Sequence, residues 1–120
     1  MENKRLSSLR AARDFEILRE DGRYFHPTRW LLVNYRFQDL GEVRCAWTIS
    51  RQTAPSVIRN RLRRWGRDYF RDWSKNFSRG LDFNLIFKRQ DKDFYRQLEH
   101  ASFDQVLTQV VNRFEQTSHS

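Results

Sequence analysis

Between residues 42 and 87 the spacing of the apolar side chains changes twice, and this change constrains the fold more than any other feature of the sequence. Over 42–50 apolar and polar residues alternate, which predicts a strand with one face in the core. Pro55 suits the first turn of a helix that runs to about Trp73, and apolar residues alternate again over 81–87. The pattern therefore predicts a strand, a helix and a second strand in direct succession.

The rest of the chain adds elements on either side of this unit. We expect an amphipathic helix over 9–21, and a strand over 30–37 that forms a hairpin with 42–50 through a short turn. Ser102 and Gln105 form a capping box, which predicts the start of a last helix. The order is helix, strands, helix, strand, helix.

This order predicts the α+β class. The expected architecture is a two-layer α/β sandwich, in which the helices pack on the apolar face of one mostly antiparallel or mixed sheet. The 38% of apolar residues can supply a core of modest size. We expect a single domain over 1–120, with a core at about 5–115 and a frayed tail at 116–120.

The helix predicted over 55–73 separates its apolar and charged side chains onto opposite faces. At about 100° per residue, one narrow stripe faces the core: Ile58, Leu62, Trp65 and Tyr69. The far side carries Arg59, Asn60, Arg63, Arg64, Arg67 and Arg71, with Arg61 at the flank. Residues 51–71 hold seven arginines and one aspartate, so this segment carries +6 of the net charge of +8. Such a face repels itself, and a phosphate partner would relieve the repulsion.

The overall charge also favours nucleic acid as the partner. The chain has 23 basic against 15 acidic residues, and 19 of the basic residues are arginine. A guanidinium group binds phosphate through two hydrogen bonds and also stacks on bases. A face that binds RNA is the favoured interpretation, and a charged face that only keeps the protein soluble is the alternative.

The sequence contains no recognisable active site. A protein nuclease needs clustered metal-binding carboxylates, or His or Lys side chains for acid–base work. The three histidines stand far apart, at His26, His100 and His119. The lone Cys45 lies in an alternating stretch, which predicts a buried thiol in a reduced cytoplasmic protein. Because no apolar segment has the length of a signal peptide or of a membrane span, we expect neither secretion nor membrane insertion.

Two adjacent segments form a more specific motif. They are Arg44-Cys45-Ala46-Trp47-Thr48-Ile49-Ser50-Arg51-Gln52 and Arg59-Asn60-Arg61-Leu62-Arg63-Arg64. The first resembles the Arg-Val-Gly-Phe-x-Val-Ser-Lys-Lys strand of the bacterial ribonuclease P protein, and the second resembles the Arg-Asn-Arg signature of that family. Further matches in the same order are Arg5-Leu6, Asp14-Phe15, Gly22-Arg23 and Asp82-Phe83. The resemblance covers about residues 5–114.

The resemblance implies a division of labour between protein and RNA. The catalytic RNA would hold Mg²⁺ and hydrolyse the phosphodiester bond, while the protein would bind that RNA and the single-stranded 5′ leader of precursor tRNA. No catalytic or metal-binding residue is then expected in this chain. The expected partners are ribonuclease P RNA, in a 1:1 complex, and precursor tRNA. The resemblance also implies a left-handed strand–helix–strand crossover, which ordinary handedness rules would not predict.

The resemblance assigns residues to two sites. The implied contacts with the catalytic RNA are Arg59, Asn60, Arg61, Arg63, Arg64 and Arg67. The implied leader cleft lies between the first helix, the open sheet face and the basic helix, and its candidate residues are Phe15, Arg19, Arg44, Thr48 and Arg51.

The chain departs from the family pattern at several positions, among them two in or beside these sites. Ala54-Pro55-Ser56 replaces a Gly-Asn turn, which puts the start of the helix in question, and Arg19 stands where a second cleft aromatic is common. The alternative function is a non-catalytic basic RNA-binding module, such as a ribosome-associated factor. A DNA-binding helix-turn-helix fits less well, because strands flank the basic helix.

Overall fold

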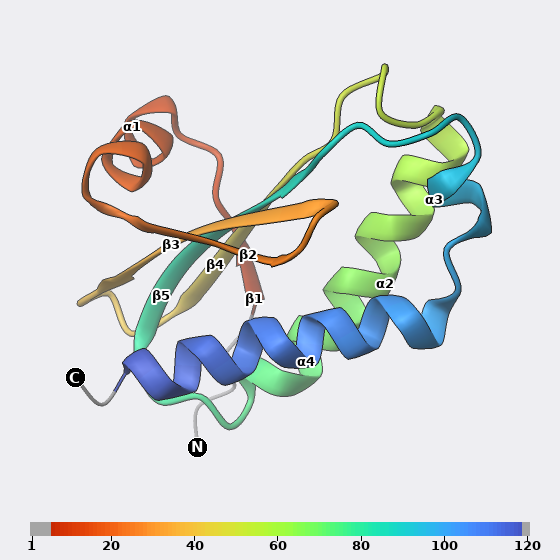
Figure 1. Ribbon diagram of the computed structural model, residues 1–120. Helices are drawn as coiled ribbons and strands as arrows, with labels where there is room; N and C mark the ends of the chain where they lie inside the picture. The colour runs from red at the N-terminus through yellow and green to blue at the C-terminus, as the bar shows by residue number, and fades with distance from the viewer. Residues whose placement is uncertain (1–5, 119–120) are drawn as a thin grey trace.

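The computed structural model describes residues 6–118, which form one five-stranded sheet and four helices (Figure 1). Arg5, which is part of the family resemblance, and His119 lie outside the described residues. The elements are β1 Leu6–Ser8, α1 Ala12–Asp21, β2 Arg23–Thr28, β3 Leu31–Gln38, β4 Val43–Thr48, α2 Ser56–Ser74, β5 Gly80–Phe87, α3 Phe94–Gln97 and α4 His100–Thr117.

The strand order of the sheet is β1-β4-β5-β3-β2. The predicted hairpin between β3 and β4 is wrong, because β5 lies between these two strands. β5 pairs with β4 in parallel and with β3 in antiparallel register, so both of its edges are hydrogen-bonded. Since β1 also pairs with β4 in parallel, the sheet is evenly mixed and not mostly antiparallel. Seven of the eight residues of β5 are buried, which suits this central position.

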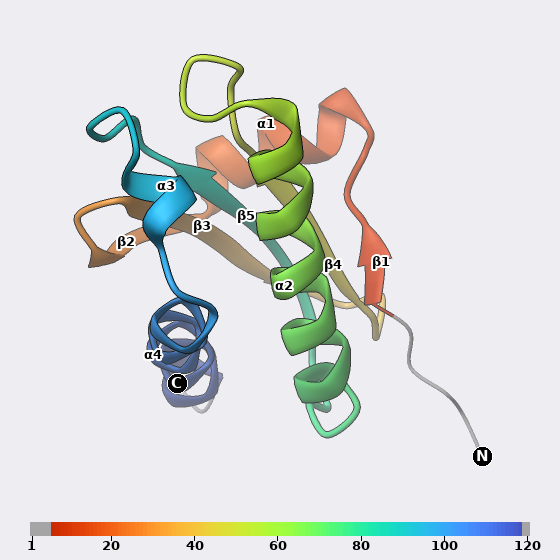
Figure 2. The ribbon, with the colours of Figure 1, turned by 90° about the vertical axis from the view of Figure 1, so that its right-hand side faces the viewer.

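The crossover β4–α2–β5 has the left hand that the resemblance implies. In Figure 2 both strands run upwards, β4 lies to the right of β5, and α2 passes in front of them. A chain that rises in β4, descends in front through α2 and returns into the sheet on the left follows a left-handed path.

The helices cover both faces of the sheet, not only one. The main core joins α2 and α4 to the odd-numbered residues of β3, β4 and β5, and it is rich in aromatic rings, with Phe83 and Phe114 at 5.0 Å between centroids. Helix α1 lies on the opposite face (Figure 1), where Leu18 packs with Leu9 and Ala46. On this face of β4, Ala46 stands between two polar residues, and its small side chain leaves room for the second cluster. The expectation that all helices share one face is therefore wrong for α1.

The last helix begins earlier than the predicted capping box. Glu99 is the N-cap of α4 and makes no side-chain cap, so Ser102 lies inside the helix and the capping prediction is wrong. His100 stacks on Trp65 of α2 with 4.3 Å between ring centroids, and this tertiary contact stabilises the first turn. At the other end α4 extends to Thr117, so two residues of the predicted tail are helical.

Candidate nucleic-acid interface

Helix α2 is attached to the sheet by residues spaced four apart. Its buried residues are Ile58, Leu62, Gly66, Phe70 and Ser74. Trp65 and Tyr69, which the sequence placed in the central stripe, are half-buried and turn towards α4 instead. Gly66 takes the central position because a Cβ there would lie 2.3 Å from Cη2 of Trp47. The close approach of the Trp47 ring rotates the buried stripe relative to the prediction.

The face of α2 turned away from the sheet carries most of the predicted arginines. Arg64 and Arg67 are exposed, and Arg59 and Arg63 are half-buried. Within residues 6–118 these four arginines form no ion pair, since the only arginine of α2 with a carboxylate partner is Arg71. Four guanidinium groups on one helix face thus keep uncompensated positive charge.

Asn60 is fixed among these arginines. Its side-chain Oδ1 accepts a hydrogen bond from Nη1 of Arg63 at 2.9 Å, one helical turn away. Nε of Arg59 is buried and makes no hydrogen bond within the described residues. The face therefore offers an oriented amide and unused guanidinium donors to a ligand.

Arg61 differs from the other arginines of α2 because the protein itself uses its donors. Its Nη2 donates to the backbone carbonyls of Tyr95 at 2.9 Å and Arg96 at 3.0 Å. Its guanidinium also lies 5.0 Å from the centre of the Trp65 ring. Arg61 therefore joins α2 to α3, and the structure does not place it with the free arginines.

The open face of the sheet carries a second polar site beneath α1. Arg44 donates to Asp82 through Nε at 2.8 Å and Nη2 at 2.7 Å, and its Nη1 reaches Asp14 of α1 at 3.4 Å. The hydrogen-bonded Asp82 carboxylate raises the pKa of the Arg44 guanidinium, although burial opposes the shift. Gln38 adds a bond to the same carboxylate at 3.1 Å. Arg44 thus anchors α1 to the sheet and has few donors left.

The other leader-cleft candidates surround this network. Phe15 of α1 packs against the Leu9 cluster and is half-buried, while Arg19 and Arg51 are exposed. Thr48 donates its hydroxyl to Oδ1 of Asn84 at 2.9 Å. Asp82 and Asn84 belong to the same site but were not among its predicted residues. The signal for them in the sequence is the alternation of β5, which places both on the face opposite its apolar residues.

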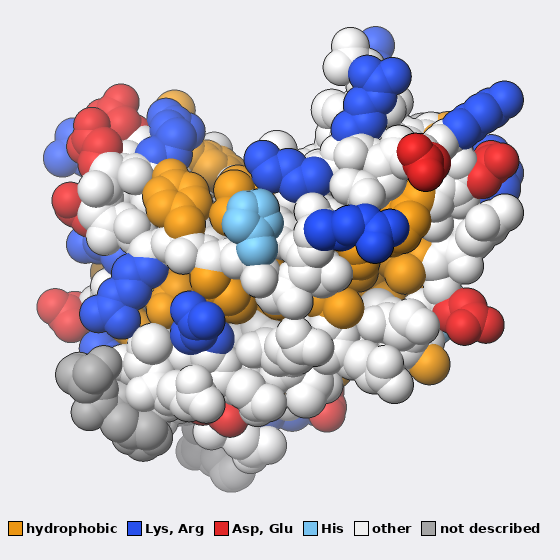
Figure 3. Space-filling model, viewed as in Figure 1, with side chains coloured by type: hydrophobic (Ala, Val, Ile, Leu, Met, Phe, Trp, Pro, Cys, Tyr) orange, Lys and Arg blue, Asp and Glu red, His pale blue; other side chains and the backbone are white. Residues whose placement is uncertain are grey.

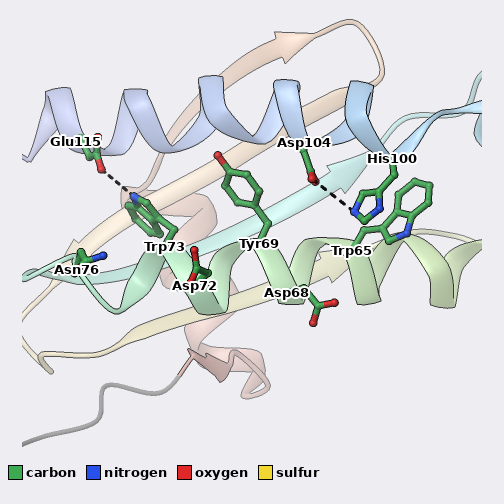
Figure 4. Close-up of a pocket in the computed structure, with 9 residues that line it drawn as sticks. All are labelled: Trp65, Asp68, Tyr69, Asp72, Trp73, Asn76, His100, Asp104 and Glu115. Atoms are coloured by element: carbon green, nitrogen blue, oxygen red, sulfur yellow. Dashed lines mark hydrogen bonds and ion pairs between the residues drawn. The ribbon is translucent and has the colours of Figure 1, made fainter.

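A large hollow of about 600 Å³ lies between α2 and α4, away from both predicted sites. Figure 4 shows that its side chains come from the two helices: Trp73 of α2 donates to Glu115 of α4 at 2.9 Å, and His100 pairs with Asp104 within α4 at 3.6 Å. Its lining includes four carboxylates, which repel phosphate. We therefore place no RNA contact in this hollow.

Two further groups have pKa values shifted by burial. Burial raises the pKa of the Cys45 thiol to about 12, although the charge of Arg67 opposes this, and the prediction of a buried thiol is confirmed. Burial also raises the pKa of Tyr95, whose hydroxyl donates to the carbonyls of Trp30 and Lys88. Residues 6–118 contain no group of three or more His, Cys, Asp and Glu side chains that could hold a metal ion. In the same range, every helix is too short or too polar to cross a bilayer.

Residues 3–117 match the model of the ribonuclease P family. The chain belongs to this family. The family identity makes it a protein component of ribonuclease P, and the role of that component is in the processing of the tRNA 5′ end. The predicted family and fold class are confirmed.

Curated relatives and solved structures agree with the family. The ribonuclease P protein component of Finegoldia magna is 29% identical over 94 residues, which cover 78% of this chain and 81% of that protein. The component of Thermotoga maritima is 23% identical over 111 residues, with coverage of 92% and 94%. Among structures, the T. maritima RNase P protein in complex with 1-(4-fluorophenyl)-2-thiourea has a TM-score of 0.77, at 23% identity and coverage of 88% and 97%. The Staphylococcus aureus RNase P protein has a TM-score of 0.74, at 16% identity and coverage of 90% and 94%.

Within the ribonuclease P fold, the predicted site residues divide into two groups by their contacts. The residues with free polar groups are Arg59, Asn60, Arg63, Arg64, Arg67, Arg19 and Arg51. Arg61, Arg44 and Thr48 instead use their donors inside the protein, and Phe15 packs against the Leu9 cluster. Which RNA atoms each residue contacts stays a prediction.

Proposed function

We propose that α2 of this ribonuclease P subunit binds the catalytic RNA, and that α1 with the open sheet face binds the 5′ leader of precursor tRNA. Removal of the leader yields the mature tRNA 5′ end. In this proposal one protein binds one RNA, in the cytoplasm, and the protein raises the affinity for substrate by screening phosphate repulsion.

The observation that carries the proposal is the uncompensated charge of α2. Arg59, Arg63, Arg64 and Arg67 form no ion pair within residues 6–118. Solvated helices usually mix acids and bases at a spacing of about four residues. The acids of α2 instead lie towards its C-terminal half, in the hollow against α4. The two signs of charge are therefore separated on α2, which supports a polyanionic partner on one face.

The chemistry is proposed to belong to the RNA. When bound, Mg²⁺ would supply charge neutralisation and an activated water, and RNA would hold it. The side chains of this protein would bind and orient the leader, and none would transfer a proton.

Cleavage of precursor tRNA at low Mg²⁺ tests the function. Three reactions contain ribonuclease P RNA alone, this protein alone, or both, and cleavage is expected only with both. Cleavage by the protein alone would reveal an active site in this chain. Binding of RNA without any stimulation of cleavage would instead support a general RNA-binding factor.

Substitution of the α2 face tests the assignment of its residues. Arg59→Ala with Arg63→Ala removes two free charges, and Lys75→Ala with Lys92→Ala is the matched control, since both lysines are exposed and lie outside this face. The first pair should weaken binding of the catalytic RNA at physiological salt and reduce the slope of log K against log salt by about 1.5–2. Equal effects of the two pairs would contradict the assignment.

A further inference from the structure

A second hollow, lined by basic residues, lies at the other end of the sheet from the start of α2. It has a volume of about 280 Å³ and is formed where α1, β3 and α4 end and where β2 and β5 begin, at the left of Figure 1. Its lining contains Arg23, Arg36 and Arg79 but only one acid, Asp21. Figure 3 shows Lys and Arg side chains on this left-hand side of the molecule, next to Asp and Glu side chains. None of the candidate RNA contacts discussed above lies in this lining.

The charge of Arg36 is uncompensated because its neighbour is already taken. Arg36 is in register with Asp82 across the β3–β5 pair, and Arg44 is in register with Asp82 on the other side. Both carboxylate oxygens of Asp82 accept from Arg44, and Gln38 adds a third bond. The Asp82 carboxylate, which lies between two arginines, is thus hydrogen-bonded to Arg44. Within residues 6–118, Arg23, Arg36 and Arg79 form no ion pair.

Arg79 is held in place without losing its charge. Its guanidinium lies 4.2 Å from the centre of the Phe37 ring, and its Nη1 donates to the carbonyl of Ser118 at 2.8 Å. This bond uses one of five N–H donors, so the group keeps donors for a ligand. A cation that is already ordered loses less entropy when it binds an anion.

The hollow is too far from the start of α2 for both to contact the same short RNA segment. Arg79 directly precedes β5, whereas α2 begins beyond the opposite end of the parallel strand β4. The length of β5 separates the two ends by about 25 Å at roughly 3.3 Å per residue. An RNA segment on Arg59, in the first turn of α2, would therefore leave the hollow free.

We propose that Arg23 and Arg79, on the α4 side of the sheet, and Arg36, on the α1 side, form a second RNA-binding site around this end of the sheet, which binds backbone phosphates. Guanidinium groups bind the two free oxygens of a phosphodiester through paired hydrogen bonds. The site rests on the proposed function, because it needs RNA on both ends of the sheet. The phosphate belongs either to the catalytic RNA or to the leader of the substrate, since both present the same group.

The experiment uses the full chain with Arg23→Gln and Arg36→Gln, because within residues 6–118 neither side chain makes a hydrogen bond or an ion pair. Arg79→Gln is a separate variant, and Lys75→Gln with Lys92→Gln is the control of equal charge. In the first arm, binding of ribonuclease P RNA to the protein is measured against KCl concentration. In the second arm, the assembled complex binds precursor tRNAs with leaders of increasing length, and mature tRNA without a leader.

The expected result is a loss of affinity of about tenfold for the double variant, from two charge-assisted contacts, with little change for the control. Loss in the first arm would assign the phosphate to the catalytic RNA, and loss only with long leaders would assign it to the leader. Affinities equal to those of the control in both arms would overturn the second site. Failure of the unsubstituted protein to stimulate cleavage would instead overturn the proposed function, so the two failures are distinguishable.

Discussion

Replacement of Arg44 by Met is expected to destabilise the fold by about 3–5 kcal/mol, because it leaves a buried carboxylate without its cation. The side chain of Asp82 is 4% exposed and that of Arg44 is 18% exposed, so water screens this pair little. Met keeps the length of the aliphatic stem, so the loss reports the charge more than the packing. After the change, the described partner left to Asp82 is the amide of Gln38 at 3.1 Å.

The same arginine provides an internal comparison. Its contact with Asp14 is longer, at 3.4 Å, and the Asp14 side chain is 27% exposed. Asp14→Asn should therefore cost at most about 1 kcal/mol. A double variant with Arg44→Met and Asp82→Leu removes both charges, and its stability should return to within about 1–2 kcal/mol of the original protein, because matched apolar replacement of a buried pair is often neutral.

Urea unfolding followed by tryptophan fluorescence and circular dichroism measures these free energies. The m-values should agree among the variants, so that differences in midpoint report stability. The reasoning is refuted if Arg44→Met costs no more than Asp14→Asn, or if the double variant is no more stable than Arg44→Met alone. Either result would mean that Asp82 does not depend on Arg44 in the folded state.

Three further predictions concern α2 and the core. Arg61→Ala should lose about 2 kcal/mol of stability, because two hydrogen bonds from a charged group are removed. Arg64→Ala should instead weaken binding of the catalytic RNA with little change in the urea midpoint. Equal losses of stability in the two variants would contradict this division. Gly66→Ala should cost about 1–3 kcal/mol by overpacking against Trp47, and the cost should shrink when it is measured in a Trp47→Leu background. Burial raises the pKa of the Cys45 thiol to about 12, so the protonated thiol contributes fully to stability below the ordinary thiol pKa, and this contribution declines as the pH rises towards 12. The difference in unfolding free energy between the original protein and Cys45→Ala should therefore change by about 1.4 kcal/mol per pH unit above roughly pH 9. A difference independent of pH would contradict the burial of the thiol.

Local periodicity was a reliable guide to several elements. The ranges predicted for the second strand, the basic helix and the last strand agree with β4, α2 and β5 to within two residues. The short elements β1, β2 and α3 were missed. β1 is three residues long and α3 is four, too few for a period to be visible in the sequence. Contacts with the rest of the fold stabilise such segments, as the bonds from Arg61 to the backbone of α3 show.

The sequence by itself determined most of the longer helices and strands, which of their faces are apolar, and that one helix concentrates the positive charge. These properties depend on side chains a few residues apart. The tertiary structure alone decided that β5 lies between β3 and β4, that α1 covers the opposite face, and that Arg44 and Arg61 are used inside the protein. Asp82 lies 38 residues from Arg44, and Tyr95 lies 34 residues from Arg61. An arginine with such a partner has the same local sequence pattern as one that is free to bind RNA, because only the folded chain brings the distant acceptor within hydrogen-bonding distance.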